Sequence, residues 1–424
     1  MKIISLIFLF ITFINFNSFA EFDNLFHLKT LRLDYIHAGD SVNEFYYFDE
    51  IKIEPYWGGS LVNLVDTFHY GKYYMKVFDV ESGLLIYSKG YSTLFGEWQT
   101  TDEAKKTNRA FTESVICPLP KYKSKIVLLS RNTRGKFEEK FEYIYEPDDY
   151  FISTERRLTY PFFDALISGN NHTCVDIVIL PDGYTEAEMG KFISDCNEFA
   201  EVLFAFEPYI KYKDKFNIRG ILAPSPESGN DIPADSVWKK TLLNTSFYTF
   251  DSERYCMTYD YKSVRDLAAN APYDQIYILV NTARYGGGAI YNYYSVSVNS
   301  NKNAAKIFIH ELGHGFAGLG DEYYNSAEPY SDFYPVDIEA WEPNLTTLVN
   351  FESKWPHLLS DKTPVPTPDK KKYFDQTGVF EGGGYASKGV YRPATDCLMN
   401  TFKKDNFCKV CSEAIEEMIL FYTK

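Results

Sequence analysis

Long hydrophobic runs and positive charge are both scarce in this sequence. After residue 16, no segment stays apolar for the ~20 residues that a membrane-spanning helix needs, so we expect no membrane span in the mature chain. Lys and Arg number 43 against 58 Asp and Glu, which gives a formal net charge of -15. This balance disfavours nucleic acid or an anionic membrane surface as a partner. Internal repeats and low-complexity tracts are also missing.

One apolar run, from Ile3 to Phe16, follows the positive charge of Lys2. The small residues around Ala20 then resemble a cleavage site, so we predict a secretory signal peptide at residues 1–20. The alternative is a membrane anchor, but the run is too short to span a bilayer, and no cysteine follows it to carry a lipid. The expected location is therefore outside the cell, in the periplasm or at the cell surface.

Residues 21–150 are expected to form an all-β, sandwich-like N-terminal accessory domain. The chain has 35 Tyr and 34 Phe, and aromatic residues are enriched in strands. Two stretches show β-rich runs on either side of a turn that ends in glycine, at Gly83 and at Gly135. The short strands with turns between them predict a small sandwich, in which we find no catalytic constellation.

Residues 151–424 have the pattern of an α+β or α/β catalytic domain. A continuous apolar run from Val175 to Leu180 predicts a buried strand. Thr185 and Glu188 then form a capping box at the start of a helix, and a second buried strand is expected at 275–281. Strand, helix and strand in this order favour helices packed on a sheet.

Seven cysteines occur in the chain, an odd number, so at least one is free or pairs between chains. Cys397, Cys408 and Cys411 crowd one short segment. We expect a structural disulfide from Cys397 to one of the other two, since disulfides form in exported proteins. The C-x-x-C spacing of Cys408 and Cys411 also occurs in redox motifs and zinc knuckles, but a single such pair is weak evidence for either.

The stretch HELGHGFAGLGDEYY, at 310–324, carries the main chemical signal. On a helix, His310 and His314 lie one turn apart, so their rings can reach one metal ion, while Glu311 lies on the adjacent flank. With only 7 histidines in the chain, chance produces H-E-x-x-H about 0.008 times. The pattern predicts a Zn²⁺ site with Glu311 as general base.

A third ligand is needed, and Asp321 is the first choice. Gly318 is a natural point for the chain to reverse, which would bring Asp321 back towards the histidines. Glu342 is the main alternative, and Glu322 and His357 are further ones. The two acids at 321–322 could instead bind a structural cation or form salt bridges.

Several segments of the second half, in their order along the chain, carry a resemblance to a known family: LPDGYT at 180–185, YGGG at 285–288, the HELGH segment, EPNLT at 342–346 and YRPATDCLMN at 391–400. In these the sequence resembles the IgA-peptidase-type family of secreted bacterial zinc metallopeptidases. The first half resembles the family's N-terminal domain more loosely. The resemblance implies a metzincin-like fold, endopeptidase activity outside the cell, and Met399 as the Met-turn beneath the zinc.

The substrate cleft is expected beside the glycines that precede a strand ending near 299. Metzincins commonly lay the substrate along an edge strand, and glycines let a second backbone approach closely; we therefore predict that the cleft is lined by Gly286, Gly287, Gly288 and Ala289. A metzincin tyrosine that sometimes stabilises the oxyanion corresponds in position to Thr401. Tyr391 or Arg392 are candidates for that role in the cleft.

The leading hypothesis is a secreted zinc endopeptidase that acts on a protein or peptide. One alternative is a zinc amidase that acts on cell-wall peptides. Another is a non-catalytic secreted binding protein with a structural metal, although a site kept only for structure has no need of a base such as Glu311. No residue ties the chain to immunoglobulin as a substrate, and no oligomeric state is predicted.

Overall fold

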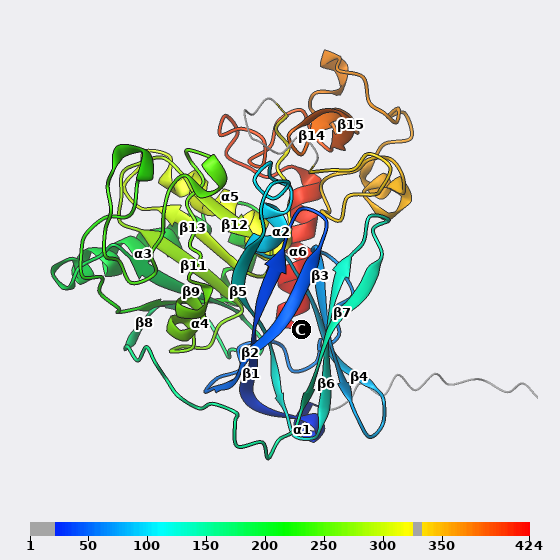
Figure 1. The fold of residues 1–424 in the computed structure, drawn as a ribbon. Helices are drawn as coiled ribbons and strands as arrows, with labels where there is room; N and C mark the ends of the chain where they lie inside the picture. Colours follow the sequence, from blue (N-terminus) through cyan, green and yellow to red (C-terminus); the bar gives the residue numbers. More distant parts are fainter. Residues whose placement is uncertain (1–21, 325–332) are drawn as a thin grey trace, which may run out of the picture.

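The structure is a computed structural model that describes residues 22–324 and 333–424. The predicted signal peptide, at 1–20, lies outside the described residues. Figure 1 shows a β-rich part at the start of the chain beside a larger part with a central sheet and helices. Within the described residues, no helix is long and apolar enough to cross a membrane.

The N-terminal part contains two antiparallel sheets, with strand orders β2-β1-β5 and β4-β3-β6-β7. The strands are β1 (Phe26–Gly39), β2 (Glu44–Glu54), β3 (Tyr73–Asp79), β4 (Leu85–Tyr91), β5 (Arg109–Pro120), β6 (Ser124–Arg131) and β7 (Phe137–Tyr145). Both predicted hairpins are confirmed, as β3–β4 and β6–β7. Gly83 and Gly135 lie in their turns with φ of 70° and 71°, a conformation that favours glycine.

Alternating residues of both sheets build one apolar core between them. Leu31 and Leu33 of β1 belong to the same buried cluster as Met75 of β3 and Leu128 of β6. The two sheets therefore pack face to face, which agrees with the sandwich expected from short strands with turns between them. Two short helices flank them, α1 (Phe22–Leu25) and α2 (Leu94–Trp98).

A six-stranded sheet forms the centre of the second part, with the order β12-β13-β11-β9-β10-β8. The four inner strands are parallel, while β8 and β12 lie antiparallel at the two edges. The bounds are β8 (Phe162–Ile167), β9 (Val175–Asp182), β10 (Phe216–Ile221), β11 (Gln275–Val280), β12 (Gly287–Ile290) and β13 (Tyr294–Val298). The two predicted buried strands are β9 and β11.

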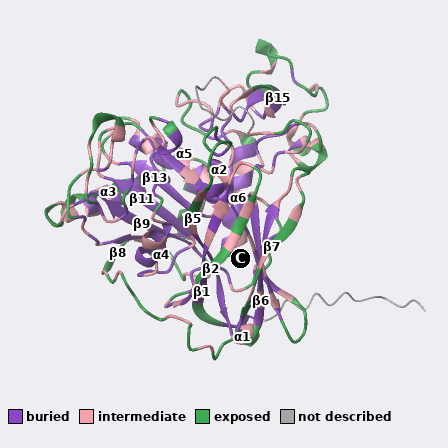
Figure 2. Cartoon of the chain, viewed as in Figure 1, coloured by how far each residue is buried: buried purple, intermediate pink, exposed green. Residues whose placement is uncertain are grey.

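Helices cover both faces of this sheet, so its inner strands are buried on both sides. They are α3 (Met189–Leu203), α4 (Tyr261–Ala268), α5 (Ala304–Ala317) and α6 (Lys409–Thr423). Ile177 and Ile179 of β9 pack in the cluster that includes α3, α5 and α6. Val178 and Leu180 face the cluster that includes α4 and α2. In Figure 2 these inner strands are buried along their length, and the exposed residues lie mostly on loops.

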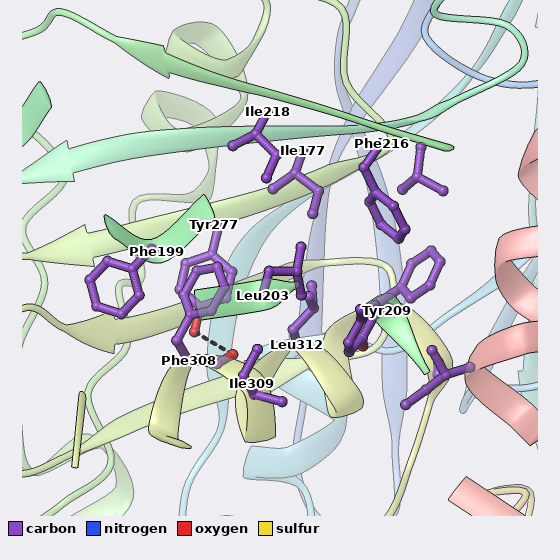
Figure 3. Packing of buried hydrophobic residues seen from close by; sticks show 14 of the residues in the cluster. Ile177, Phe199, Leu203, Tyr209, Phe216, Ile218, Tyr277, Phe308, Ile309 and Leu312 are labelled. Atoms are coloured by element: carbon purple, nitrogen blue, oxygen red, sulfur yellow. Dashed lines mark hydrogen bonds between the residues drawn. The ribbon is translucent and has the colours of Figure 1, made fainter. Parts of the chain in front are cut away.

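Packing in the first of these clusters fixes the helix that carries the histidines. Phe308 and Leu312 of α5 lie with Phe199 of α3 beneath the sheet, as Figure 3 shows. The hydroxyl of Tyr277 on β11 donates a hydrogen bond of 3.1 Å to the carbonyl of Phe308. The helix is therefore attached to the sheet by both apolar contact and a buried hydrogen bond.

The predicted capping box is present, although the helix begins later than the sequence indicates. The Thr185 backbone N–H donates to Glu188 Oε2 at 2.9 Å. This box opens the short 3₁₀ turn η1 (Glu186–Glu188), and α3 follows it. On α3, Phe192, Cys196 and Phe199 are buried, whereas Met189 and Ile193 are only partly covered.

In the described residues between α5 and α6, the chain forms turns and one hairpin. The hairpin pairs β14 (Phe380–Gly383) with β15 (Ala386–Arg392). Further short 3₁₀ turns along the described chain are η2 (Tyr209–Lys215), η3 (Pro233–Asp235), η4 (Thr249–Asp251), η5 (Phe351–Ser353), η6 (Pro356–Leu358) and η7 (Lys371–Tyr373).

The N-terminal part shares a buried interface with the second part. Phe95 and Trp98 of α2 belong to the same apolar cluster as Val264 of α4. Next to it, the guanidinium of Arg32 is fully buried and bridges to Asp266 of α4 at 2.8 Å. The N-terminal part is thus positioned firmly enough to contribute side chains to a site on the other part.

Candidate active site

Helix α5 carries His310 and His314 and ends where the sequence predicts a reversal. Gly318 caps the helix with φ of 65°, and its N–H donates to carbonyls of the last turn. Gly315 lies against the sheet, where a Cβ would come within 2.3 Å of Ser295 Oγ on β13. The glycines therefore let the helix lie close to the sheet and then turn back sharply.

The reversal brings Asp321 onto the two imidazoles. Nε2 of His310 and Nε2 of His314 lie 3.0 Å apart, and Asp321 Oδ1 lies 3.2 Å and 3.3 Å from them. These three side chains form one of two groups of metal-capable donors found in the described residues. Helical spacing and a glycine turn were the signals that predicted this arrangement.

The Nδ1 atom of each ring forms a hydrogen bond with a backbone carbonyl. His310 Nδ1 lies 3.0 Å from the carbonyl of Leu398, and His314 Nδ1 lies 2.5 Å from that of Leu319. A carbonyl can only accept, so in the neutral rings Nδ1 carries the hydrogen. Nε2 is then left with its lone pair towards the centre of the cluster, as metal-binding histidines require.

The donor set fits a zinc ion. Zinc binds imidazole nitrogen and carboxylate oxygen at about 2.0–2.2 Å in a tetrahedron, whose ligand atoms then lie about 3.3 Å apart. The observed separations are 3.0–3.3 Å. Asp321 Oδ1 is buried and has no hydrogen-bond partner among the described residues, although it lies between two rings. A shared cation would satisfy that oxygen.

Two side chains position the loop that carries Asp321. The Tyr385 hydroxyl donates to Asp321 Oδ2 at 2.6 Å, which leaves Oδ1 for the cluster. Asn344 is fully buried and bonds both backbone groups of Gly320, at 2.7 Å and 2.9 Å. Neither role was predicted, since Tyr385 lies 64 residues from Asp321 along the chain and no local pattern links the two.

In the protein without bound metal, the acid and the rings shift one another's protonation. Burial lowers the pKa of His314, but Asp321 and Glu311 outweigh it, so that this pKa rises to about 9. Burial raises the pKa of Asp321, yet the two imidazoles outweigh burial and leave it well below its usual range. A cation at this point replaces the proton on the imidazole pair.

Glu311 lies beside the donor group and is not one of its members. Burial raises the pKa of its carboxyl, an effect that the neighbouring histidines partly offset. A Cβ on Gly287 of β12 would lie 3.1 Å from Glu311 Oε1, so the glycine leaves space for the carboxylate. A raised pKa suits a group that must both accept and release a proton near neutral pH.

A cleft of about 2000 Å³ opens over these residues. Gly286, Gly287, Gly288 and Ala289 all line it, together with His310, Glu311, His314 and Asp321. The cleft runs between the two parts of the chain, because residues of α2 and of the β6–β7 turn also line it. A volume of this size exceeds what most small-molecule sites offer.

Strand β12 is an edge strand at this cleft, although part of its outer edge is covered. Gly287 exchanges backbone hydrogen bonds of 3.1 Å with Arg254 and Cys256, so its outer edge is closed. Ala289 has the same parity along the strand, and its backbone groups therefore also point away from β13. It is the strand residue whose outward N–H and C=O face the cleft.

Glu97 of α2 is a cleft residue that the sequence did not indicate. Its carboxylate accepts a hydrogen bond from the Tyr255 hydroxyl, and burial raises its pKa to about 7. The negative charges of Asp321 and Glu311 contribute in the same direction, while His314 opposes them. A titratable acid thus enters the cleft from the N-terminal part.

The other predicted ligand candidates lie elsewhere. Glu342 is buried and accepts a hydrogen bond from the Tyr334 hydroxyl at 2.9 Å. Glu322 turns towards Cys411, and His357 pairs with Glu413 on the surface. Of the acids considered, the structure brings only Asp321 to the two histidines in the part of the chain that it describes.

Tyr391 and Arg392 are not among the described residues that line the cleft, contrary to the prediction. Arg392 is buried, and its guanidinium donates to the carbonyls of Glu381 and Gly382 within the β14–β15 hairpin. The backbone of Tyr391 pairs with Thr346. Both residues are therefore occupied in supporting the hairpin, while Tyr385 at its tip is the one that faces the cleft.

Met399 lies beneath the histidine helix in the main core cluster and is fully buried. Its sulfur would lie 3.1 Å from a Cβ at Gly313. The segment around it also supplies the Leu398 carbonyl to His310. Thr401, in the place considered for an oxyanion group, lines the cleft.

The expected disulfide from Cys397 is absent. All seven cysteines are free, and the Cys397 and Cys411 sulfurs lie 3.8 Å apart. The three cysteines do come together as their proximity in the sequence predicts, but their thiols surround the carboxylate of Glu322.

Comparison with known families accounts for nearly the whole chain. Residues 164–377 and 369–419 match the profile of the family described as IgA Peptidase M64, and residues 21–142 match its companion, Peptidase M64 N-terminus. A comparison with curated proteins gives no match. The match covers the two histidines, the loop after Gly318 that carries Asp321 and Glu322 (the ligand loop), and the segment of Met399. The chain belongs to the M64 family of peptidases.

Proposed function

We propose that the protein is a zinc-dependent endopeptidase in which Glu311 is the general base. The observation that carries the proposal is the convergence of His310, His314 and Asp321 on one point in a wide cleft, with the carboxylate of Glu311 beside them. Three protein ligands leave a coordination position for the reactants, as catalytic zinc sites do. The metzincin-like arrangement, with Met399 as the Met-turn, is part of this proposal.

Zinc bound to the three donors supplies Lewis-acid activation of a water molecule and of the scissile carbonyl. The protein supplies the proton transfers. Glu311 takes the proton from the attacking water as the hydroxide oxygen bonds to the carbonyl carbon. It then delivers that proton to the nitrogen of the leaving amine as the C–N bond breaks. Its raised pKa strengthens it as the proton acceptor in the first transfer.

The backbone of β12 positions the substrate. An extended peptide pairs with the outward N–H and C=O of Ala289, in the mode by which a strand adds to a sheet edge. Tyr255 and its neighbours close the edge at Gly287, so the pairing is limited to a short stretch of substrate. The size of the cleft favours a polypeptide over a small amide as substrate.

The place of action is part of the proposal. The apolar run at 3–16 and the small residues up to Ala20 support export and cleavage after Ala20. The protein then acts outside the cell, in the periplasm or at the cell surface. N-terminal sequencing of protein recovered from an expressing culture tests this: a mature chain that begins at Glu21 supports export, and an intact Met1 in all fractions contradicts it.

The test of activity is digestion of a mixed peptide library by the purified mature protein. We expect internal cleavage that stops when a chelator removes the metal and returns when zinc is added. Glu311→Gln should retain zinc but lose at least ~10²-fold in kcat, since a positioned base contributes about 10²–10⁴-fold. The exposed Glu352→Gln is the matched control and should cleave normally. Cleavage that survives both the chelator and Glu311→Gln rejects the proposal.

A further inference from the structure

A second cluster of metal-capable side chains lies next to the first. Its members are Glu322, Cys397, Cys408 and Cys411, and their donor atoms all lie within 4.8 Å of one another. Three of the residues are buried, and Cys408 is partly covered. No role in the peptidase mechanism uses these side chains, so their convergence requires a separate explanation.

Three distant segments meet at this cluster. Glu322 follows Asp321 in the ligand loop, and Cys397 belongs to the turn that carries Met399. Cys408 is the N-cap of α6, and Cys411 lies in its first turn. The cluster thus joins the floor of the candidate active site to the C-terminal helix.

The spacing of the donors matches a tetrahedron around one zinc ion. Zinc–sulfur bonds of about 2.3 Å place two sulfurs about 3.8 Å apart, and the Cys397 and Cys411 sulfurs are separated by 3.8 Å. A sulfur and a carboxylate oxygen would lie about 3.5 Å apart on the same basis. Glu322 Oε1 lies 3.1 Å from the Cys411 sulfur and 3.9 Å from that of Cys408, on either side of this value.

Glu322 provides an independent indication that a cation is needed. Its side chain is fully buried. Oε1 accepts from Asn344 Nδ2 at 3.1 Å, but Oε2 has no hydrogen-bond partner in the described part of the chain. A buried carboxylate among thiols is costly unless a charge compensates it. A divalent cation supplies that charge.

Backbone groups around the cluster favour sulfur in its thiolate form. The Cys408 N–H donates to the Cys397 sulfur at 3.1 Å, and the Cys411 N–H donates to the Cys408 sulfur at 3.5 Å. The N-terminus of α6, where two of the cysteines lie, also stabilises negative charge. Thiolates are the form in which cysteine binds metal.

A disulfide explains the arrangement less well. The Cys397 and Cys411 sulfurs, 3.8 Å apart, are well beyond a bond length of about 2.05 Å. Any single disulfide among the three would leave one thiol unpaired, and Glu322 Oε2 would still have no hydrogen-bond partner among the described residues. Soft thiolate donors select zinc over magnesium or calcium.

We propose that Glu322, Cys397, Cys408 and Cys411 bind a second zinc ion that is structural. Four protein ligands close its coordination shell, so it has no open position for a substrate. The ion fastens the ligand loop and the Met399 turn to α6. It therefore positions Asp321 through the adjacent residue Glu322. The Glu322 N–H also donates a backbone hydrogen bond of 2.8 Å to the Met399 carbonyl, which links the loop to the Met399 turn.

The experiment measures bound zinc and free thiols in the purified mature chain. Elemental analysis should find two zinc ions per chain, with no disulfide in the intact mass. His314→Ala should retain one zinc, and after exchange for cobalt it should show the near-ultraviolet absorption of thiolate bound to cobalt. Cys408→Ser with Cys411→Ser should lose that zinc and unfold at a lower temperature. Cys174→Ser, outside the cluster, is the matched control and should bind two zinc ions per chain.

The outcomes separate this site from the catalytic one. One zinc in both the wild type and His314→Ala, with the cobalt–thiolate absorption, supports the thiol site and rejects the histidine site. A His314→Ala protein that binds no zinc and gives no such absorption overturns the proposal. A disulfide between Cys397 and either other cysteine in the active wild-type protein also overturns it. If the double cysteine variant does not fold, the wild-type and His314→Ala measurements still decide.

Discussion

Asp321 and Glu322 are neighbours in the chain, yet their carboxylates belong to two different donor clusters. Asp321 Oδ1 lies 3.2 Å from His310 Nε2, whereas Glu322 Oε1 lies 3.1 Å from the Cys411 sulfur. The loop after Gly318 therefore contributes to both clusters, and contacts that hold one of the two carboxylates in place also restrain the other.

Tyr385→Phe is expected to weaken zinc binding at the histidine site without changing the fold. The variant loses the 2.6 Å hydrogen bond to Asp321 Oδ2. Partners of metal ligands contribute about 10–100-fold to metal affinity, and a loss in that range is predicted in competition with a chromogenic chelator. Tyr391→Phe, in the same hairpin but outside the cleft, is the control. Equal affinity for the two variants would show that Tyr385 does not position Asp321.

Gly287→Ala should impair catalysis more than zinc binding. The new Cβ would lie 2.7 Å from the Val296 carbonyl and 3.1 Å from Glu311 Oε1, so the base or the strand must move. Overpacking of this kind costs about 1–3 kcal/mol in stability. We predict a lower kcat, an unchanged zinc content and a lower unfolding midpoint.

The control for this variant is Gly190→Ala in α3. Gly190 lies in the first turn of α3, a Cβ there meets nothing within 4 Å, and Ala has a higher helix propensity than Gly. This variant should be fully active and somewhat more stable. A Gly287→Ala protein with normal kcat would contradict the position assigned to Glu311.

Glu97 predicts a stability that falls as pH rises. Burial raises the pKa of its carboxyl to about 7 from an ordinary 4.5, so the folded chain binds more protons than the unfolded chain between these values, and stability declines across this window. Glu97→Gln removes the titration. The unfolding free energy of the variant minus that of wild type should therefore increase between pH 4.5 and pH 7. Urea unfolding of the metal-free protein measures this difference. A stability difference independent of pH would refute the assignment.

Loss of the buried ion pair of His37 is expected to destabilise the protein, most strongly at low pH. Burial lowers its pKa, but Glu113, at 2.9 Å, and Glu44 outweigh burial and raise it above 6.5. For a raised histidine pKa, the stabilisation is complete below 6.5 and is lost as pH rises through the folded value. His37→Gln should therefore destabilise the protein by about 3 kcal/mol near pH 6 and by less at high pH. A larger destabilisation at high pH than near pH 6 would contradict a charged His37.

Local spacing was sufficient for those parts of the fold and site that neighbouring residues determine. One helical turn separates His310 from His314, and the reversal at Gly318 brings Asp321 to them. Both hairpins of the first part follow from glycine turns between β-rich runs. In each case, the residues that make the contact lie no more than 21 positions apart along the chain.

The remaining features depend on contacts between distant segments, for which one sequence carries no signal. Glu97 reaches the cleft only because α2 packs against the second part. The carbonyl that orients His310 comes from Leu398, 88 residues away. A disulfide from Cys397 to Cys408 or Cys411 was expected, because no local pattern shows that Glu322 lies among these cysteines. Arg392 was expected in the cleft, but its guanidinium is used within the β14–β15 hairpin.

The central claim is that a zinc ion is bound by His310, His314 and Asp321 while Glu311 stays unligated. Anomalous diffraction at the zinc absorption edge, from crystals of the mature protein, tests it most directly. The account predicts a peak about 2.0–2.2 Å from both Nε2 atoms and Asp321 Oδ1, with the Glu311 carboxylate outside bonding distance. Crystals grown with zinc that show no peak there, or a peak with Glu311 as the fourth ligand, would contradict it.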